Sequence, residues 1–348
     1  MKSSERLIWP DLLRGVSCFS VILIHITSVG INDYELSSPV YFLSALINSL
    51  LRWAVPVFFM ISGMFLLDPD HEITEKKMRR KLTRLLLIIV VWGVFYSVLE
   101  DICNGGVNAT SILKAILYVW KGVGGYHLWF LYTLFFFYLA IPVMRIVVRY
   151  ATRKLLWGCV ICWFLFSLCV IWLNNLAEII PTLSIFSVEW KFEVLSGYVG
   201  YFILGYLLSK ANVISKKLIF FALGILFALL IIADVIFMKV LHLSPQVVAD
   251  PQGGLTCLLA IFIFLLCKDL KIKNEKLKGI INKVEENSMG IYLIHVFWIT
   301  LIFRILNVDY VFLGSFSFMY WFVFIALLSI GSAILIKKVS CIKKFVTL

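Results

Sequence analysis

Charged residues are scarce in this chain. Asp, Glu, Lys and Arg make up 15% of its 348 residues, whereas 62% are hydrophobic and the mean hydropathy is +0.98. A soluble domain of this length needs a largely polar surface, and this composition does not supply one. The scarcity of charge therefore excludes a soluble globular protein and indicates an integral membrane protein.

Long polar stretches, low-complexity segments, proline-rich or serine-rich linkers and clear internal repeats are also missing. The longest polar stretches span about 15 to 20 residues, which is too short for an independently folded unit. We therefore expect a single membrane-embedded domain over residues 1–348, with no additional soluble domain.

Apolar runs, in contrast, recur from one end of the chain to the other. A run of about 18 or more apolar residues can cross a hydrocarbon core of about 30 Å as a helix. The pattern predicts an all-α membrane protein with about ten transmembrane helices. The expected spans are residues 8–29, 41–67, 84–102, 126–147, 155–173, 194–209, 217–237, 254–267, 288–305 and 316–336.

The net charge of +12 is distributed unevenly between the loops. Every second loop, together with the two ends of the chain, holds 25 Lys and Arg residues, and the opposite loops and helix ends hold six. The positive-inside rule then predicts cytoplasmic termini and an even number of spans. We therefore attribute the basic charge to membrane topology and not to nucleic acid. The basic segment 74–83 (TEKKMRRKLT) is expected to form an amphipathic helix on the cytoplasmic surface.

The first span carries three ionisable residues, Asp11, Arg14 and His25. A charge inside a span costs about 2.5 to 3.5 kcal/mol on insertion scales, so such residues usually serve a function. Asp11 and Arg14 are three residues apart and can pair on one helix face. Arg14 and His25 are eleven residues apart, which places them on one face and about 16 Å apart along the helix axis. The alternative is that Asp11 and Arg14 extend to the cytoplasmic surface and His25 is a buried polar group of the bundle.

Further polar residues occur in later spans. Arg52 is expected near the outer end of the second span, where a proline and the Ser62-Gly63 pair indicate an irregular helix packed within the protein. His127 and Trp129 open the fourth span near the outer interface, where Trp129 also suits an aromatic anchor. His295 lies inside the ninth span. We assign these five residues to a candidate substrate cavity, and because the setting is apolar we expect no metal site.

Four motifs in order resemble the membrane acyltransferase-3 family. They are residues 11–15 (DLLRG) followed by His25, residues 55–63 (VPVFFMISG), residues 126–130 (YHLWF) and residues 288–295 (SMGIYLIH). The resemblance covers essentially the whole chain. Among subgroups, the chain is most similar to the short O-acetyltransferases of the enterobacterial-common-antigen type.

The resemblance implies a multi-pass enzyme of the bacterial plasma membrane that takes acetyl from cytoplasmic acetyl-CoA. The acceptor would be a hydroxyl group of a cell-envelope glycan or glycolipid. We expect the CoA phosphates near Arg14 and one or more of Arg79, Arg80 and Arg84, because guanidinium groups pair well with phosphate. The pantetheine arm would then bring the thioester to His25.

His25 is expected to act as the general base on the acceptor hydroxyl, or to accept the acetyl group itself before passing it on. Asp11 would support Arg14 within the same site. The rival hypothesis is a multi-span transporter or an amino-acid-binding membrane protein, in which the same Arg and His residues line a permeation path. The spacing of Arg14 and His25 and the dense basic loop favour the acyltransferase.

Overall fold

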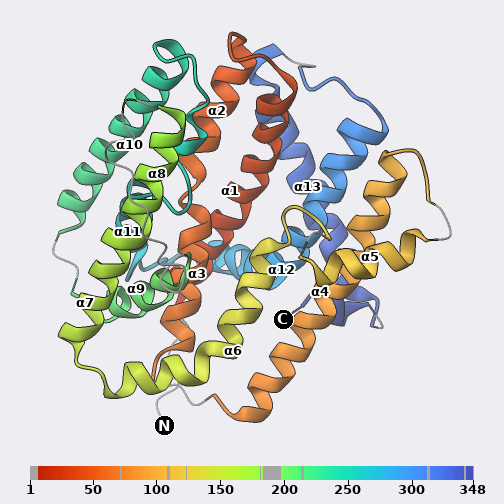
Figure 1. Cartoon of the computed structure of the whole chain (residues 1–348). Coiled ribbons are helices and arrows are strands. Elements are labelled where there is room, and N and C mark those ends of the chain that lie inside the picture. The colour runs from red at the N-terminus through yellow and green to blue at the C-terminus, as the bar shows by residue number, and fades with distance from the viewer. Residues whose placement is uncertain are drawn as a thin grey trace.

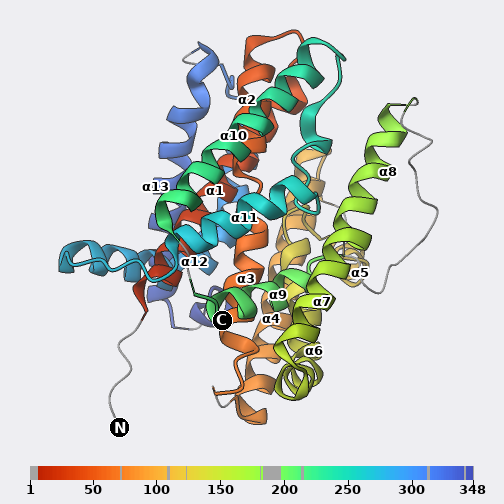
Figure 2. The same cartoon turned by 90° about the vertical axis from the view of Figure 1, so that its left-hand side faces the viewer.

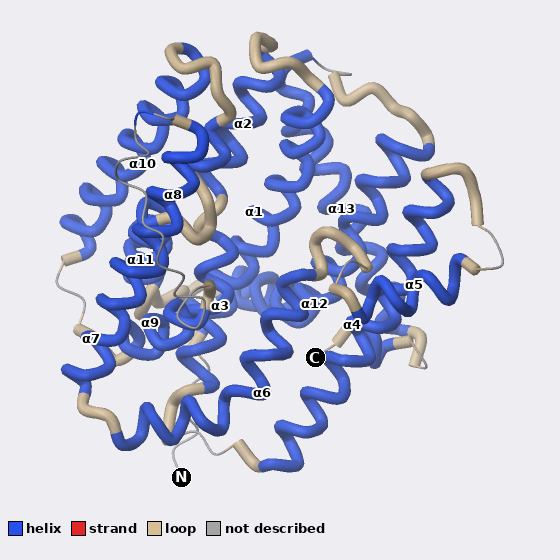
Figure 3. The backbone as a smooth tube through the Cα atoms, in the orientation of Figure 1, coloured by secondary structure: helices blue, strands red, loops and turns tan. Residues whose placement is uncertain are grey.

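The computed structural model describes residues 7–70, 73–107, 110–122, 124–180, 182, 197–212, 215–311, 314–340 and 342–347. Within these residues helices are the only regular structure, and no strand occurs among them (Figure 3). The prediction of an all-α membrane protein is therefore confirmed.

Thirteen α-helices, two π-helical segments and three short 3₁₀ helices are described. The first half of the chain holds α1 (Ile8–Asp33), α2 (Pro39–Leu51), α3 (Ala54–Leu66), α4 (Glu75–Cys103), α5 (Ser111–Trp120), α6 (Trp129–Tyr150), α7 (Arg153–Trp163), the π segment η1 (Phe164–Cys169) and α8 (Val170–Ile179). The second half holds α9 (Val199–Ser209), α10 (Lys216–Lys239), η4 (Pro245–Val247), α11 (Gly254–Cys267), α12 (Glu275–Thr300), the π segment η5 (Leu301–Ile305), η6 (Gly314–Phe316), α13 (Ser317–Lys338) and η7 (Lys343–Phe345).

Each of the ten expected spans overlaps a helix, and residues 194–196 of the sixth lie outside the described residues. Eight helical stretches among the described residues are long and apolar enough to cross a membrane, and the two shorter apolar helices are α9 and α11. A helix rises about 1.5 Å per residue, so α9 and α11 measure about 16 and 21 Å, less than the hydrocarbon core. Both pack against α3, inside the bundle. The exact number of full crossings and the side of the termini stay predictions.

The basic segment 74–83 is helical, as expected, and its place on the cytoplasmic surface stays a prediction. It is the first part of α4, which runs without interruption from Glu75 to Cys103. Lys and Arg are good helix formers and no breaker separates them from the apolar run, so the helix simply continues. The Thr74 hydroxyl caps its start by accepting a hydrogen bond from the Lys77 backbone N–H.

The second span is interrupted in its middle. Its 28 residues, Pro39–Leu66, are divided into α2 and α3 by a break at Arg52 and Trp53. The sequence-based placement of Arg52 near the outer end of the span is therefore corrected, because Arg52 lies at the internal break. Pro56 is the third residue of α3, where its missing N–H leaves no helical hydrogen bond unmade.

α1 lies at the centre of the bundle, where it packs against α2, α3, α11, α12 and α13 (Figure 1). α12 is seen nearly end-on in Figure 1 and lengthwise in Figure 2, so it crosses α1 at a steep angle. The polar residues in the middle of α1 are thus surrounded by other helices and not by lipid.

Candidate active site

One cavity is lined by the first parts of α1 and α4, by the middle of α12, and by α3 and α6. We call it the Arg14 cavity. Its volume is about 350 Å³, and Arg14, Lys81 and Glu285 are the charged residues that line it together with Glu286. Its remaining lining is mostly aromatic and apolar, with Tyr138 and Tyr292 among the larger side chains.

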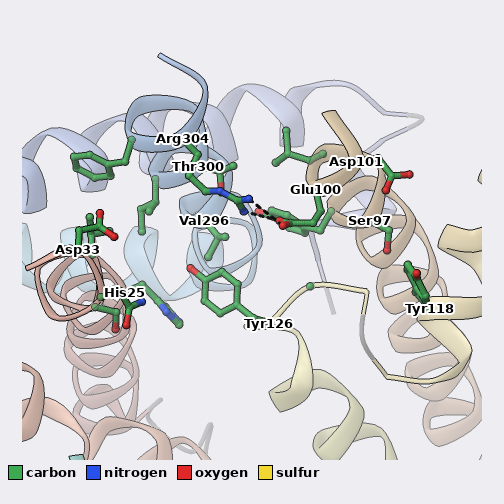
Figure 4. Close-up of a pocket in the computed structure, with 18 of the residues that line it drawn as sticks. His25, Asp33, Ser97, Glu100, Asp101, Tyr118, Tyr126, Val296, Thr300 and Arg304 are labelled. Carbon is green, nitrogen blue, oxygen red and sulfur yellow. Dashed lines mark hydrogen bonds and ion pairs between the residues drawn. The ribbon is translucent and has the colours of Figure 1, made fainter. Parts of the chain in front are cut away.

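A second and larger cavity lies among the last parts of α1, α4 and α12. We call it the Arg304 cavity, and its volume is about 690 Å³. Arg304 binds Glu100 through two hydrogen bonds of 2.6 and 3.0 Å, and Asp33 and Asp101 also line the cavity. Figure 4 shows Tyr126 between His25 and the Arg304–Glu100 pair. Carboxylates, hydroxyl groups and exposed tyrosine rings are side chains that suit a polyhydroxylated ligand.

His25 lines both cavities. Along each of α1, α4 and α12, the residues that line the Arg14 cavity come before those that line the Arg304 cavity. Arg14 and His25 both line the Arg14 cavity, as their helical spacing predicted. A group held at His25 is therefore accessible from two separate spaces.

Three histidines meet at this point, His25 from α1, His295 from α12 and His127 from the turn before α6. The ring centroid of His25 lies 5.2 Å from that of His295 and 6.3 Å from that of His127. His127 and His295 are 5.6 Å apart, and Tyr126 lies 5.2 Å from His25. Among the described residues no group of three or more His, Cys, Asp or Glu side chains has the arrangement to hold a metal ion.

His295 is fully buried behind His25 and lines neither cavity. Its Nδ1 lies 2.6 Å from the backbone carbonyl of Tyr292. A carbonyl oxygen only accepts hydrogen bonds, so this contact places a proton on Nδ1 and leaves the Nε2 lone pair free in the neutral ring. This nitrogen has no partner among the described residues.

The segment of α12 around His295 is held by Tyr96 of α4. The Tyr96 hydroxyl donates to the carbonyl of Leu293 at 2.5 Å and accepts from the N–H of Phe297 at 3.1 Å. These backbone groups are four residues apart and would otherwise bond to each other in a helix. Tyr96 therefore fixes the helical turn that carries His295. Sequence analysis missed it, because one tyrosine in an apolar run gives no distinguishing signal.

An asparagine of α2 holds the turn of α1 that carries His25. The Asn48 side-chain amide donates to the Ile24 carbonyl at 2.8 Å, with the hydroxyls of Thr27 and Ser28 at 3.0 and 3.3 Å. Its oxygen accepts from Nε of Arg52 at 2.8 Å. Asn48 is 2% exposed, so this network is shielded from solvent. The sequence did carry a signal here, a lone amide inside an apolar helix.

Arg14 forms its ion pair with Glu285 of α12 at 2.5 Å. The sequence suggested that Arg14 pairs with Asp11, but in the structure its guanidinium pairs with Glu285. Asp11 is buried in the first turn of α1. Lys81, which also lines the Arg14 cavity, lies over the ring of Tyr138 at 5.8 Å. Glu285 and Lys81 were not among the sequence-derived candidates, because helix neighbours cannot be assigned from one chain's spacing.

The three arginines proposed for CoA phosphates lie along the first part of α4. Arg79 and Arg80 are exposed, Arg84 is half-buried, and none of the three lines the Arg14 cavity. Their proposed role stays a prediction.

The five substrate-cavity candidates divide into two groups. Ser62, His127 and Trp129 line the Arg14 cavity, whereas Arg52 and His295 line neither cavity and support its surroundings. The Ser62 hydroxyl donates to the Phe58 carbonyl at 2.8 Å. Trp129 stacks on Tyr198, with ring centroids 5.2 Å apart, so it packs within the protein as well as facing the cavity.

These observations define a multi-pass membrane protein with an internal histidine site that two cavities approach. A family model described as an acyltransferase domain, that of the acyltransferase-3 family, matches residues 7–338. The chain therefore belongs to this family, and it is a membrane acyltransferase. No curated protein and no solved structure matches the chain.

Proposed function

We propose that this acyltransferase moves an acetyl group from cytoplasmic acetyl-CoA to a hydroxyl group of a cell-envelope glycan or glycolipid, in the plasma membrane of a bacterium. The observation that carries the proposal is that His25 lines both cavities. A donor and an acceptor that enter from opposite sides can then meet at one imidazole.

The Arg14 cavity is assigned to the donor. Along α1, α4 and α12 its lining residues come before those of the Arg304 cavity, and basic loops flank the starts of these helices. The positive-inside rule places these loops in the cytoplasm. Arg14 and Lys81 provide cationic partners for CoA phosphates, and Arg79, Arg80 and Arg84 add positive charge where α4 begins. The axial distance of about 16 Å from Arg14 to His25 is of the order of an extended pantetheine arm.

The Arg304 cavity is assigned to the acceptor. Its hydroxyl, amide and carboxylate groups match the hydrogen-bonding capacity of a sugar, and its tyrosine rings offer apolar faces for a pyranose ring. The similarity to the enterobacterial-common-antigen subgroup makes the lipid-linked form of that polysaccharide the first acceptor to test.

The chemistry at His25 has two routes. In the direct route the imidazole takes the proton of the acceptor hydroxyl, the hydroxyl oxygen attacks the thioester carbon, and the thiolate of CoA leaves and recovers the proton. In the relay route the imidazole itself attacks, releases CoA, and transfers the acetyl group to the acceptor in a second step. Both routes place His25 within reach of the two substrates.

The test is transfer of radiolabel from [acetyl-¹⁴C]acetyl-CoA to the purified protein and to a glycolipid extract. Wild type is compared with His25→Ala and with the control His242→Asn, which changes an exposed loop histidine whose φ of 54° asparagine tolerates. We expect label in the extract with wild type and His242→Asn, and none with His25→Ala. Label that stays on wild-type protein and is lost in His25→Ala supports the relay route.

Two results would contradict the proposal. Equal transfer by His25→Ala and wild type would remove His25 from the reaction. If folded wild-type protein did not bind acetyl-CoA, acetyl-CoA would not be its acyl donor, and the transporter hypothesis would be favoured.

A further inference from the structure

His127 is a buried polar side chain whose hydrogen bonds are missing. It is 2% exposed, and neither Nδ1 nor Nε2 makes a hydrogen bond of good geometry among the described residues. The nearby backbone carbonyl of Leu293 already accepts the Tyr96 hydroxyl. Most buried polar groups in proteins are hydrogen-bonded, and a buried group left unpaired costs about 1 to 3 kcal/mol. The polar ring atoms of His127 thus contribute little to the stability of the fold. A bound ligand would supply the missing hydrogen bond.

The surrounding protein holds the His127 ring in place. Its backbone carbonyl accepts a hydrogen bond from the Tyr292 hydroxyl at 2.5 Å, and its ring packs edge-to-face on Tyr96 at 4.6 Å. The chain reaches this position through Gly124 and Gly125. A Cβ on Gly124 would lie 2.9 Å from the backbone of Gly93 in α4, and Gly125 has a φ of +144°. The donor is thus pre-positioned, as electrostatic catalysis requires.

The ring also faces the right space. His127 lines the Arg14 cavity, and its centroid is 6.3 Å from that of His25. A thioester carbonyl placed against His25 would therefore lie next to His127. We propose that His127 is a catalytic residue that donates a ring N–H to the carbonyl oxygen of the acyl thioester as negative charge develops on it. This inference rests on the proposed function.

The step balances without any further reactant. A nucleophile, either the acceptor hydroxyl or the His25 ring, forms a bond to the carbonyl carbon, and the π electron pair of the C=O bond moves to the oxygen. The His127 N–H stabilises this oxyanion but does not transfer its proton. When the pair returns, the C–S bond breaks and the CoA thiolate leaves. In the direct route the thiolate takes the proton that His25 removed from the acceptor hydroxyl. In the relay route it takes the N–H proton of the acylated His25 ring, and the acceptor hydroxyl returns a proton to that ring when the acetyl group is transferred in the second step. The role is the same in the direct and the relay routes.

Two other donors that line this cavity are committed to backbone carbonyls, and a third is more exposed. The Ser62 hydroxyl donates to the Phe58 carbonyl, and the Tyr292 hydroxyl donates to the carbonyl of His127 itself. The Trp129 indole lies in the same cavity but is 36% exposed, so water can satisfy its N–H in the absence of ligand. His127 differs from these three donors because its ring is both buried and next to His25.

The experiment compares His127→Gln, which keeps an N–H donor, with His127→Leu, which removes it. The control is His242→Asn, an exposed loop residue outside both cavities. For each variant, kcat, KM and the Kd for acetyl-CoA are measured. We expect His127→Leu to lower kcat by roughly 100- to 1,000-fold, the usual effect of removing one oxyanion donor, with the Kd within about threefold of wild type. His127→Gln is expected to retain kcat within about tenfold.

A spectroscopic measurement separates this role from a structural one. Acetyl-CoA labelled with ¹³C at the carbonyl is bound to each variant, and its C=O stretching band is recorded by difference infrared spectroscopy. A hydrogen bond to the carbonyl lowers the band frequency. We expect the lowered band in wild type, His127→Gln and the control His242→Asn, and a return toward the frequency of free acetyl-CoA in His127→Leu.

The outcomes are distinct. A His127→Leu variant with kcat within fivefold of wild type, or with a loss of acetyl-CoA affinity as large as its loss of kcat, would overturn the assignment. If His127→Leu does not fold, His127→Gln decides: a retained band and kcat support the role, and a band at the free frequency with normal binding refutes it. Absence of acetyl-CoA binding by wild type would instead mean that the proposed function fails.

Discussion

The Arg14 guanidinium lies 2.5 Å from the Glu285 carboxylate and joins α1 to α12 beside the Arg14 cavity. Because both side chains are largely buried, the carboxylate offsets charge that a polyanionic ligand would otherwise meet. We expect Glu285→Gln to lower the Kd for CoA by roughly two- to fivefold at low salt, and Arg14→Gln to raise it by roughly tenfold or more. Calorimetric titration with CoA at two salt concentrations measures both.

Glu75→Gln is the matched control for this prediction. Glu75 is the first residue of α4 and also pairs with an arginine, but it is 86% exposed and its 3.8 Å contact with Arg79 is solvated. We expect no change in affinity beyond about twofold. A Glu285→Gln variant that binds CoA more weakly than wild type would mean that Glu285 orients Arg14 for the phosphates instead of competing with them.

The two cavities predict two separable classes of variant. Arg304→Gln breaks the bidentate pair with Glu100 in the Arg304 cavity, and Lys81→Gln removes a cation from the Arg14 cavity. We expect Arg304→Gln to raise the KM for the acceptor several-fold with the Kd for acetyl-CoA unchanged, and Lys81→Gln to do the reverse. Steady-state kinetics combined with donor titration measures both quantities. If either variant changed both the KM for the acceptor and the Kd for acetyl-CoA, the two cavities would not bind separate substrates.

Asn48 is predicted to act on catalysis through the backbone of α1. Asn48→Ala removes the bonds to Ile24, Thr27 and Ser28 and leaves Arg52 without its acceptor. We expect a loss of about 1 to 3 kcal/mol in stability together with a fall in kcat of roughly tenfold. Thermal unfolding in detergent and the label-transfer assay measure the two effects.

The control for Asn48 is Ser44→Ala in the same helix. The Ser44 hydroxyl is buried and lies 3.3 Å from that of Tyr310, away from His25. This variant should lower stability without changing kcat. If both variants reduce kcat equally, the effect of Asn48 is general loosening of the bundle and not placement of His25.

The crossing of α3 and α9 depends on two glycines. A Cβ on Gly63 would lie 2.0 Å from the carbonyl oxygen of Phe202, and one on Gly205 would lie 2.0 Å from that of Met60. Because the obstacle is backbone, the helices must separate, and we expect Gly63→Ala and Gly205→Ala each to cost about 3 kcal/mol or more. Gly224→Ala in α10 meets nothing within 4 Å and should be neutral or stabilising. Thermal stability of the three variants in one detergent tests this directly.

The Lys210–Asp68 pair, outside the spans, predicts a pH effect. The Lys210 ammonium bonds the Asp68 carboxylate at 2.9 Å, and this hydrogen bond raises the pKa of Lys210 above its ordinary value. A raised lysine pKa contributes stability below the unfolded-state pKa of about 10.4, and the contribution is lost as the pH rises through the folded-state value. We expect Asp68→Asn to lower stability by less than about 1 kcal/mol between pH 6 and 9, because the lysine is partly exposed.

The matching measurement is thermal unfolding of wild type and Asp68→Asn across the alkaline range. The stability difference should be constant up to about pH 9 and shrink above about pH 11. A difference that already shrinks between pH 6 and 9 would show that another titrating group is responsible.

The apolar runs and the spacing within one helix were sufficient to predict much of this protein. Transfer of a segment into a membrane depends on the sum of its residues' hydrophobicities, so the ten apolar helices could be located without knowing their neighbours. Arg14 and His25 belong to one continuous helix, whose periodicity places both on the face that lines the Arg14 cavity. These inferences need only local information along the chain.

The tertiary structure decided which side chains meet. It paired Arg14 with Glu285, brought His127 and His295 to His25, and placed Asn48 and Tyr96 against the turns that carry the two histidines. It also moved Arg52 to an internal break and continued α4 through the basic segment. Contacts between helices depend on close packing, on glycines such as Gly63 that allow backbones to approach, and on buried hydrogen bonds. These terms act between residues far apart in the sequence, and hydropathy and periodicity do not contain them.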